Sequence, residues 1–336
     1  YLESGERDPE EITFMEPQAG GACRAGNIYN LLQRVLYRMV EQGQLEYAQI
    51  PVISLNLMGE EKHTGFRITP SLLSGGIAAG CYGDLIMCLY QQVKPYEQNP
   101  GETDRIRSQV EKKLCESIRR HRNGRHTREK NYRYACEVFS KVPVKPGKKK
   151  RVGITGEIYM KYSKLGNDDI ESFLLRQGME PYSGGFVNYC LYLVDTERYK
   201  AEKYQHNPIM AKACAFVLHR LCEAQKHLLT VIGETDRFQT DLPFPELKEK
   251  VQGILAEGCN TGDGWLIAAE VIQYVEKGCG SVLILHPFGC LVSHVCERGI
   301  LQRLHARFPD VSIQTIEYDY DQSKTLRESR ILLAIS

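Results

Sequence analysis

The sequence predicts an α/β protein with two Rossmann- or flavodoxin-like lobes that contain parallel sheets, the first lobe being partial and carrying a helical insertion. Short apolar runs rich in β-forming residues alternate with segments of helical periodicity. This alternation favours parallel strands joined by right-handed crossovers. The breaker-rich stretch VPVKPGKKK separates two such series near residue 150. We therefore expect domains at 1–150 and 151–336.

The first domain should contain two strands, a helix between them and three further helices. EEITFMEP reads as a short strand, GNIYNLLQRVLYRMVEQG as an amphipathic helix and IPVISLNL as a buried strand. A mostly apolar helix and two charged helices follow before the breaker. The expected elements are, in order, strand 10–17, helix 26–43, strand 50–57, helix 70–95, helix 102–122 and helix 127–140.

The second domain starts again with a β-run and continues with the same alternation. Its first helix has Asn167 or Asp168 as a cap and Gly178 as a stop. NTGDGWLIAAEVIQYVEKG predicts a capped helix and SVLILH a strand. The expected elements are strand 151–160, helix 167–178, helices 206–231 and 243–257, the NTGDGW helix, the SVLILH strand, helix 291–308, a strand over VSIQTIEYD and helix 322–335.

Composition excludes several classes of protein. The hydrophobic content of 42% and charged content of 25% are ordinary for a globular chain. Asp84 interrupts the longest apolar run, which argues against a membrane span, and the N-terminus lacks the pattern of a signal peptide. The 12 cysteines include no CxxC pair, so most should pack in the core and a secreted disulfide scaffold is not expected. We expect a cytoplasmic protein.

Positive charge is concentrated in one block. Residues 105–151 contain 17 Lys and Arg against 4 Glu, a balance of +13, which leaves −12 for the rest of a chain of net charge +1. Such a block can attract phosphates or an acidic partner, and the alternative is two solvated helices with a basic linker. Nucleic-acid binding ranks last because few aromatic residues interrupt the block.

Two loops have the same design. ITFMEPQAGGACRAGN and VLILHPFGCLVSH each have a strand, a proline, a glycine turn, a cysteine and a helix start. Ligands of open parallel sheets bind beyond the carboxyl ends of the strands. Gly21 and Gly289 would let backbone approach a cofactor, and a helix terminus would favour thiolates at Cys23 and Cys290. The pair could hold a metal centre between the domains, or the cysteines could simply pack.

Motifs spanning nearly the whole chain carry a resemblance. PFGCLVSHVCERGILQRLHARFPDVSIQTIEYDYDQSKTLRESRILL resembles the C-terminal region of the 2-hydroxyacyl-CoA dehydratase and benzoyl-CoA reductase group. It is closer to the large proteins known as CoA-substrate-specific enzyme activases or activase-related proteins. ACRAGNIYNLLQRVL, IPVISLN, YGDLIMCLYQQVKPYEQNPGETD, RVGITGEIYMKYSKLGNDDIESFL and NTGDGWLIAAEVI resemble the same proteins in the same order.

The resemblance implies an iron–sulfur protein. Relatives hold a [4Fe–4S] or double-cubane cluster with cysteines from separate α/β domains, and an ATP-hydrolysing activator drives an electron into it. By position in the motif, Cys290 and Cys23 would be ligands. A cluster usually needs three or four thiolates. Cys259 is a weaker candidate for the third, and a position upstream of Tyr1 is another. The substrate would be a CoA thioester or another small molecule, and a dimer is compatible with this interpretation.

Sequence features leave one functional alternative open. No GxxxxGK[ST] or GxGxxG motif and no glycine-rich phosphate motif of acetate-kinase-like ATPases occurs, so this chain would be the electron-accepting, dehydratase-like portion. The alternative is a non-catalytic α/β assembly module that docks to an activator and whose cysteines are structural.

Other residues near the predicted strand ends are weaker candidates. Glu157 and Lys161 could act in acid–base chemistry or anchor a substrate, or form an exposed pair around a turn. Gly156, before them, is a third candidate glycine for cofactor binding. His286 and His294 flank Cys290 and suggest zinc, although one ends a strand and the other lies in a helix.

Two further motifs have structural explanations that we prefer. Trp265, after NTGDG, is expected to anchor its helix in the core rather than to serve as a substrate platform. The stretch EYDYDQS at 317–323 could bind a cation, but a helix cap is the simpler expectation.

Overall fold

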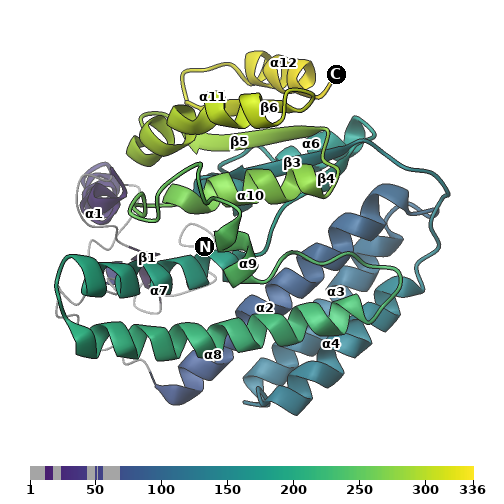
Figure 1. The fold of residues 1–336 in the computed structure, drawn as a ribbon, viewed down its shortest axis with the longest axis horizontal. Coiled ribbons are helices and arrows are strands. Elements are labelled where there is room, and N and C mark those ends of the chain that lie inside the picture. The colour runs from purple at the N-terminus through teal and green to yellow at the C-terminus, as the bar shows by residue number, and fades with distance from the viewer. Residues whose placement is uncertain (1–11, 18–23, 44–49, 51, 56–68) are drawn as a thin grey trace. The chain divides into compact units, whose positions relative to one another are not determined.

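The computed structural model describes residues 12–17, 24–43, 50, 52–55 and 69–336 (Figure 1). The chain divides into two compact units, residues 1–68 and 69–336. Residue 150, where we expected a domain boundary, falls inside the second unit. That boundary stays a prediction, and the two units are described separately.

The first unit contains a small parallel sheet and one amphipathic helix. Strands β1 (Phe14–Pro17) and β2 (Val52–Leu55) pair in parallel, with Phe14 opposite Val52. Between them lie a 3₁₀ turn (Arg24–Asn27) and α1 (Ile28–Glu41). Leu36 and Ile50 are buried together. The described elements follow the predicted strand–helix–strand order, with shorter strands.

The second unit is organised around a four-stranded, all-parallel sheet, which confirms the predicted α/β class. Its strands are β3 (Arg151–Gly156), β4 (Glu180–Tyr182), β5 (Ser281–Pro287) and β6 (Ser312–Tyr318). Their order across the sheet is β4-β3-β5-β6. The chain moves from β3 to one side and then returns to the other side of β3, so the order reverses between β3 and β5. This is a doubly wound arrangement.

Helices cover both faces of this sheet (Figure 1). Helices α6 (Ile170–Arg176) and α12 (Lys324–Ile335) pack on the face that includes Ile154 and Leu283. Helices α10 (Gly264–Glu276) and α11 (Arg298–Arg307) pack on the face that includes Val282 and Ile284. Because side chains alternate along a strand, the continuous apolar run of β5 supplies both cores.

A helical layer adjoins the sheet within the same unit. It consists of α2 (Pro70–Val93), α3 (Glu102–Arg119), α4 (Arg125–Ser140), α7 (Phe186–Lys203) and α8 (Pro208–Gly233). These helices and the start of α10 share one apolar cluster that includes Leu85, Phe139, Leu191, Leu228 and Trp265. Helix α2 begins at a Thr69 cap, whose hydroxyl accepts from the Leu72 amide at 3.1 Å.

Among the described residues, one helix, 71–96, is long and apolar enough to span a membrane by length and composition. The single charge of Asp84 therefore does not exclude it, contrary to our expectation from the sequence. The same segment supplies Leu85, Leu89 and Val93 to the apolar cluster of the helical layer. Core helices of globular proteins also satisfy this length-and-composition criterion.

Several boundaries differ from those predicted. The β-run 151–160 ends at Gly156, and Ile158–Tyr162 forms a short helix, α5. Helix α9 is confined to Phe244–Glu249, and the helix expected over 291–308 begins with a π-helical turn, Ser293–Glu297. Strand β4 and the 18-residue helix α7 were not predicted. Aromatic and β-branched residues weaken the intrinsic helix propensity of α7, and burial of Leu191 and Tyr192 compensates for it.

Candidate functional site

The candidate site lies at the carboxyl ends of β3 and β5, where the strand order reverses. Glu157 follows β3 directly, and Cys290 lies three residues after the end of β5. The two loops are joined because the Glu157 amide donates to the Leu285 carbonyl at 2.8 Å. In doubly wound sheets, ligands bind in the crevice at such a reversal. The fold thus brings together two of the residues selected from the sequence.

Two predicted glycines have conformational roles here. Gly156 has φ +133°, and a Cβ on it would lie 2.0 Å from the Leu285 carbonyl oxygen. Gly289 has φ +67° and reverses the chain immediately before Cys290. Residues other than glycine rarely adopt these positive backbone φ angles. The close approach of β3 to β5 therefore explains why residue 156 is a glycine.

The Cys290 thiol is half-buried and held by the π-helical turn. Burial raises its pKa, while the hydroxyl and amide of Ser293 lower it and the charges of Glu297 and Glu157 raise it. The net upward shift differs from our expectation that a helix terminus would favour the thiolate, because desolvation is the largest effect. The carbonyl of Cys290 is 2.7 Å from Nδ1 of His294.

Two carboxyl groups, those of Glu157 and Glu297, lie near this thiol, and a third, that of Asp263, lies near them. Glu157 caps α5 by accepting from the Met160 amide at 3.0 Å, and burial raises its pKa. Burial raises the pKa of Glu297 to about 8, and one of its oxygens accepts from Ser293 Oγ at 2.7 Å. Asp263 is also buried, and desolvation followed by the charge of Glu157 holds its pKa well above the usual range. Burial therefore favours the protonated form of all three carboxyl groups.

The second oxygen of Glu297 has no hydrogen-bond partner among the described residues. Buried polar atoms are rarely left without a partner, and water or a ligand often satisfies those that are. This atom is one of the clearest signs that the protein contacts alone do not complete the site.

Lys161 lies beside this group but points into the protein. Its Nζ binds both oxygens of Glu270, at 2.7 and 2.9 Å, and Thr155 Oγ1 donates to the same carboxylate at 2.5 Å. The side chains of Lys161 and Glu270 are each 3% exposed. Neither Glu157 nor Lys161 therefore belongs to an exposed pair around the turn, and Lys161 serves here as the partner of a buried acid.

Two more cysteines lie in this region. Burial raises the pKa of Cys296 to about 11, and the charges of Cys259, Glu297 and Cys290 add to that shift. Cys296 is thus close enough to Cys259 and to Cys290 to be influenced by both. Cys259 was a weak candidate from the sequence, and Cys296 was missed because nothing in its local pattern distinguishes it from a core cysteine.

The described part of the chain does not assemble a complete metal site. No group of three or more His, Cys, Asp or Glu side chains in it is arranged to hold a metal ion. The rings of His286 and His294 are 5.6 Å apart, but they form no zinc site with Cys290. His286 is fully buried, and burial lowers its pKa. Cys23 and Gly21 lie outside the described residues.

Two other motifs have the structural roles that we preferred. Trp265 is buried, with its ring 5.1 Å from that of Tyr192 and 5.8 Å from that of Phe244. In the stretch 317–323, Ser323 caps α12 by accepting from the Leu326 amide at 3.2 Å.

Comparisons with known proteins add no family assignment: no family model, no curated protein and no solved structure matches this chain.

Proposed function

We propose that this protein is an iron–sulfur electron-transfer component related to the 2-hydroxyacyl-CoA dehydratases. It would receive low-potential electrons from an ATP-hydrolysing activator and act on a CoA thioester or another small substrate. Cys290 and Cys23 would each supply one thiolate to a [4Fe–4S] or double-cubane cluster. The observation that supports the proposal most is the position of Cys290, after a glycine turn at the strand-order reversal of a parallel sheet.

The surroundings of Cys290 suit one cluster ligand. Ser293 offers its backbone N–H to the sulfur, and such donors tune the potential of cluster thiolates. Protonation of Glu157 and Glu297 would limit the negative charge beside a cluster that is itself negative. Once bound, the cluster would supply one-electron transfer. The other ligands must come from Cys23 and from positions not yet assigned.

Anaerobic reconstitution tests this assignment. The wild type should bind iron and sulfide and show charge-transfer absorption from thiolate to iron. Cys23→Ala combined with Cys290→Ala should abolish that absorption and most of the bound iron. The matched control is Cys115→Ala combined with Cys214→Ala, which removes two thiols from α3 and α8 and should leave the iron content unchanged.

The result that would overturn the proposal is full cluster occupancy in the Cys23/Cys290 double variant. Equal loss of iron in both double variants would also overturn it, because the iron would then be bound nonspecifically. Circular dichroism of each variant should confirm that helix content is retained.

A second candidate function is a non-catalytic assembly module that docks to an activator. It is favoured by the absence of a three-ligand metal group among the described residues and by the enclosure of Lys161 with Glu270. This function predicts that the reconstituted wild type contains no cluster but still co-elutes with the activator in size-exclusion chromatography.

A further inference from the structure

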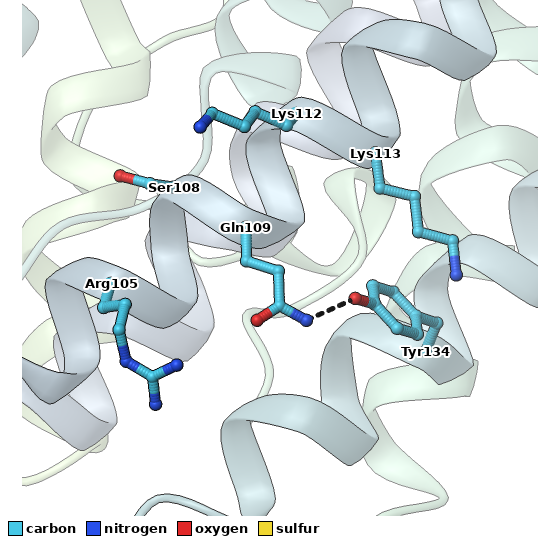
Figure 2. Close-up of a pocket in the computed structure, with 6 residues that line it drawn as sticks. All are labelled: Arg105, Ser108, Gln109, Lys112, Lys113 and Tyr134. Atoms are coloured by element: carbon cyan, nitrogen blue, oxygen red, sulfur yellow. Dashed lines mark hydrogen bonds between the residues drawn. The ribbon is translucent and has the colours of Figure 1, made fainter.

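One face of α3 carries three exposed cations at regular intervals, and the single acid between Lys112 and Arg119 on this face, Glu116, is paired with Arg120. Arg105, Lys112 and Arg119 are exposed and follow one another at seven-residue intervals, so they lie on one side of the helix. We call these three residues, together with Lys113, the α3 basic face. Arg105, Lys112 and Lys113 border an open hollow of about 750 Å³, which Ser108, Gln109 and Tyr134 also line (Figure 2). No carboxylate from the described part of the chain lines it.

Most cations of this face have no ion pair within the described residues. Lys112 and Arg119 have none there, and Arg105 has only a long ion pair with Glu102, at 3.9 Å. Two exposed cations on the neighbouring helix α4 and its C-cap are instead paired with acids one turn away. These pairs are Arg133 with Glu129 at 3.0 Å and Lys141 with Glu137 at 2.6 Å.

Tyr134, the aromatic residue that lines the hollow, already has two contacts within the protein. Gln109 Nε2 donates to the Tyr134 hydroxyl at 2.9 Å, as Figure 2 shows, and Lys113 Nζ lies 3.2 Å from the centre of the ring. Proteins that bind single-stranded nucleic acid combine a basic groove with aromatic rings free to stack on bases. Tyr134 does not offer such a platform, so the hollow is poorly suited to nucleic acid.

The spacing of the cations fits a different partner. Seven residues of α-helix correspond to about 10.5 Å along the axis. Phosphates in one strand of a duplex are spaced about 3.4 Å apart along its axis, so cations at this interval would leave most of them unpaired. Carboxylates on one face of an acidic helix repeat at the same interval as the cations, which permits residue-by-residue pairing.

We propose that the α3 basic face is a docking surface for an acidic protein segment in helical conformation. The proposal does not depend on the cluster, because it rests only on the charge, spacing and exposure of α3. Charge complementarity of this kind accelerates association and makes it sensitive to salt.

The test uses the full chain and a fluorescein-labelled helical peptide with glutamates at i, i+3, i+4 and i+7. Fluorescence anisotropy should detect binding that weakens as salt is raised. The triple variant Arg105→Glu, Lys112→Glu, Arg119→Glu should weaken it roughly tenfold or more, because attraction becomes repulsion. The corresponding glutamine variant should give an intermediate affinity. A labelled oligothymidylate should bind less tightly than the peptide.

A local measurement and a matched control accompany the titration. Cys115 is exposed three residues after Lys112, so bound peptide should slow its alkylation by iodoacetamide, followed by mass spectrometry of the tryptic peptide. The control reverses three exposed cations elsewhere, with Lys203→Glu, Lys212→Glu and Arg330→Glu. It should retain wild-type affinity.

Three outcomes would overturn the proposal. They are wild-type affinity in the α3 triple variant, an equal loss of affinity in the control, and tighter binding of oligothymidylate that is lost in the α3 variant. The last result would instead assign the face to nucleic acid.

Discussion

Lys161 and Glu270 form the most enclosed ion pair among the described residues, and the site is built against it. Glu270 accepts from both Lys161 and Thr155, so its carboxylate has three close donor contacts. Removing one partner from such a pair costs more than the pair contributes, because the remaining charge is buried without compensation. The arrangement therefore constrains α5 relative to α10, next to Glu157 and Asp263.

We predict that Lys161→Met lowers the free energy of unfolding by about 3–5 kcal/mol, the range for breaking a buried pair. Adding Glu270→Gln should restore much of that loss, since the neutral amide can still accept from Thr155. Urea denaturation of the wild type, both single variants and the double variant measures the coupling. Additive effects of the two substitutions would show that the ion pair has little energetic importance.

The site residues that could be predicted differ from the others because a local sequence pattern marks their positions. Cys290, Gly289 and Glu157 follow recognisable strands, and the carboxyl ends of parallel strands meet at one edge of a sheet. Asp263 and Glu297 reach the same place from the start of α10 and from a π-helical turn. No local pattern marks them, because only tertiary packing determines their burial.

At the level of whole elements, Asp84 joins α2 to α7. It lies in the most apolar stretch of the sequence, yet its oxygens accept from the amides of Phe186 and Val187 at 2.7 and 3.0 Å. These amides belong to the first turn of α7, which has free N–H groups to satisfy. Gly185 is required beside them, since a Cβ there would lie 2.3 Å from an oxygen of Asp84.

Burial raises the pKa of Asp84 to about 7, despite the two amide donors. A raised pKa in the folded state means that the folded protein binds more protons than the unfolded chain between about pH 4 and 7. The contribution of Asp84 to stability is therefore fully present in acid and is lost as the pH rises through this window.

We predict that the wild type loses up to ~1.4 kcal/mol more stability per pH unit than Asp84→Asn over that window. Comparison with the variant is needed because Glu297 and Asp263 shift in the same direction. Urea denaturation from pH 4 to 7 gives both slopes. Parallel slopes would show that Asp84 is ionised in the folded protein throughout the range.

The sequence predicted the apolar strand β5 better than helix α7, which has polar and aromatic faces. β5 is an uninterrupted apolar run, and its burial on both sides of a sheet requires that composition. Helix α7 mixes tyrosines with acids, because it packs against α2 and α8 and its buried polar groups find partners both within the helix and beyond it. Asp195, for example, is bound by Arg198 at 2.8 Å and by Lys248 at 2.7 Å. Such contacts cannot be inferred from periodicity.

For the molecule as a whole, the central question is where the chain divides. The breaker at 142–150 suggested independent domains on either side of residue 150. In the structure, α2 and α4 share an apolar cluster with α7, α8 and α10, which lie beyond residue 150. The compact unit that contains the sheet begins instead at Thr69.

These two divisions predict different behaviour of fragments. Fragment 69–336 should unfold cooperatively, because it retains the three apolar clusters of its unit. Fragment 151–336 should not, since it exposes apolar side chains such as Leu191, Leu228 and Val231, each worth about 1.5–3 kcal/mol when fully buried. Three such losses approach the total stability of a typical domain, about 5–15 kcal/mol.

Thermal unfolding followed by circular dichroism, with dye binding as a measure of exposed apolar surface, separates the two cases. We expect a sharp transition and little dye binding for 69–336, and a broad transition with strong dye binding for 151–336. A sharp transition for the shorter fragment would place the boundary at residue 150 after all. The contact between α2 and α7 would then be an interface between two domains rather than part of one core, and Asp84 would be one of its interface residues.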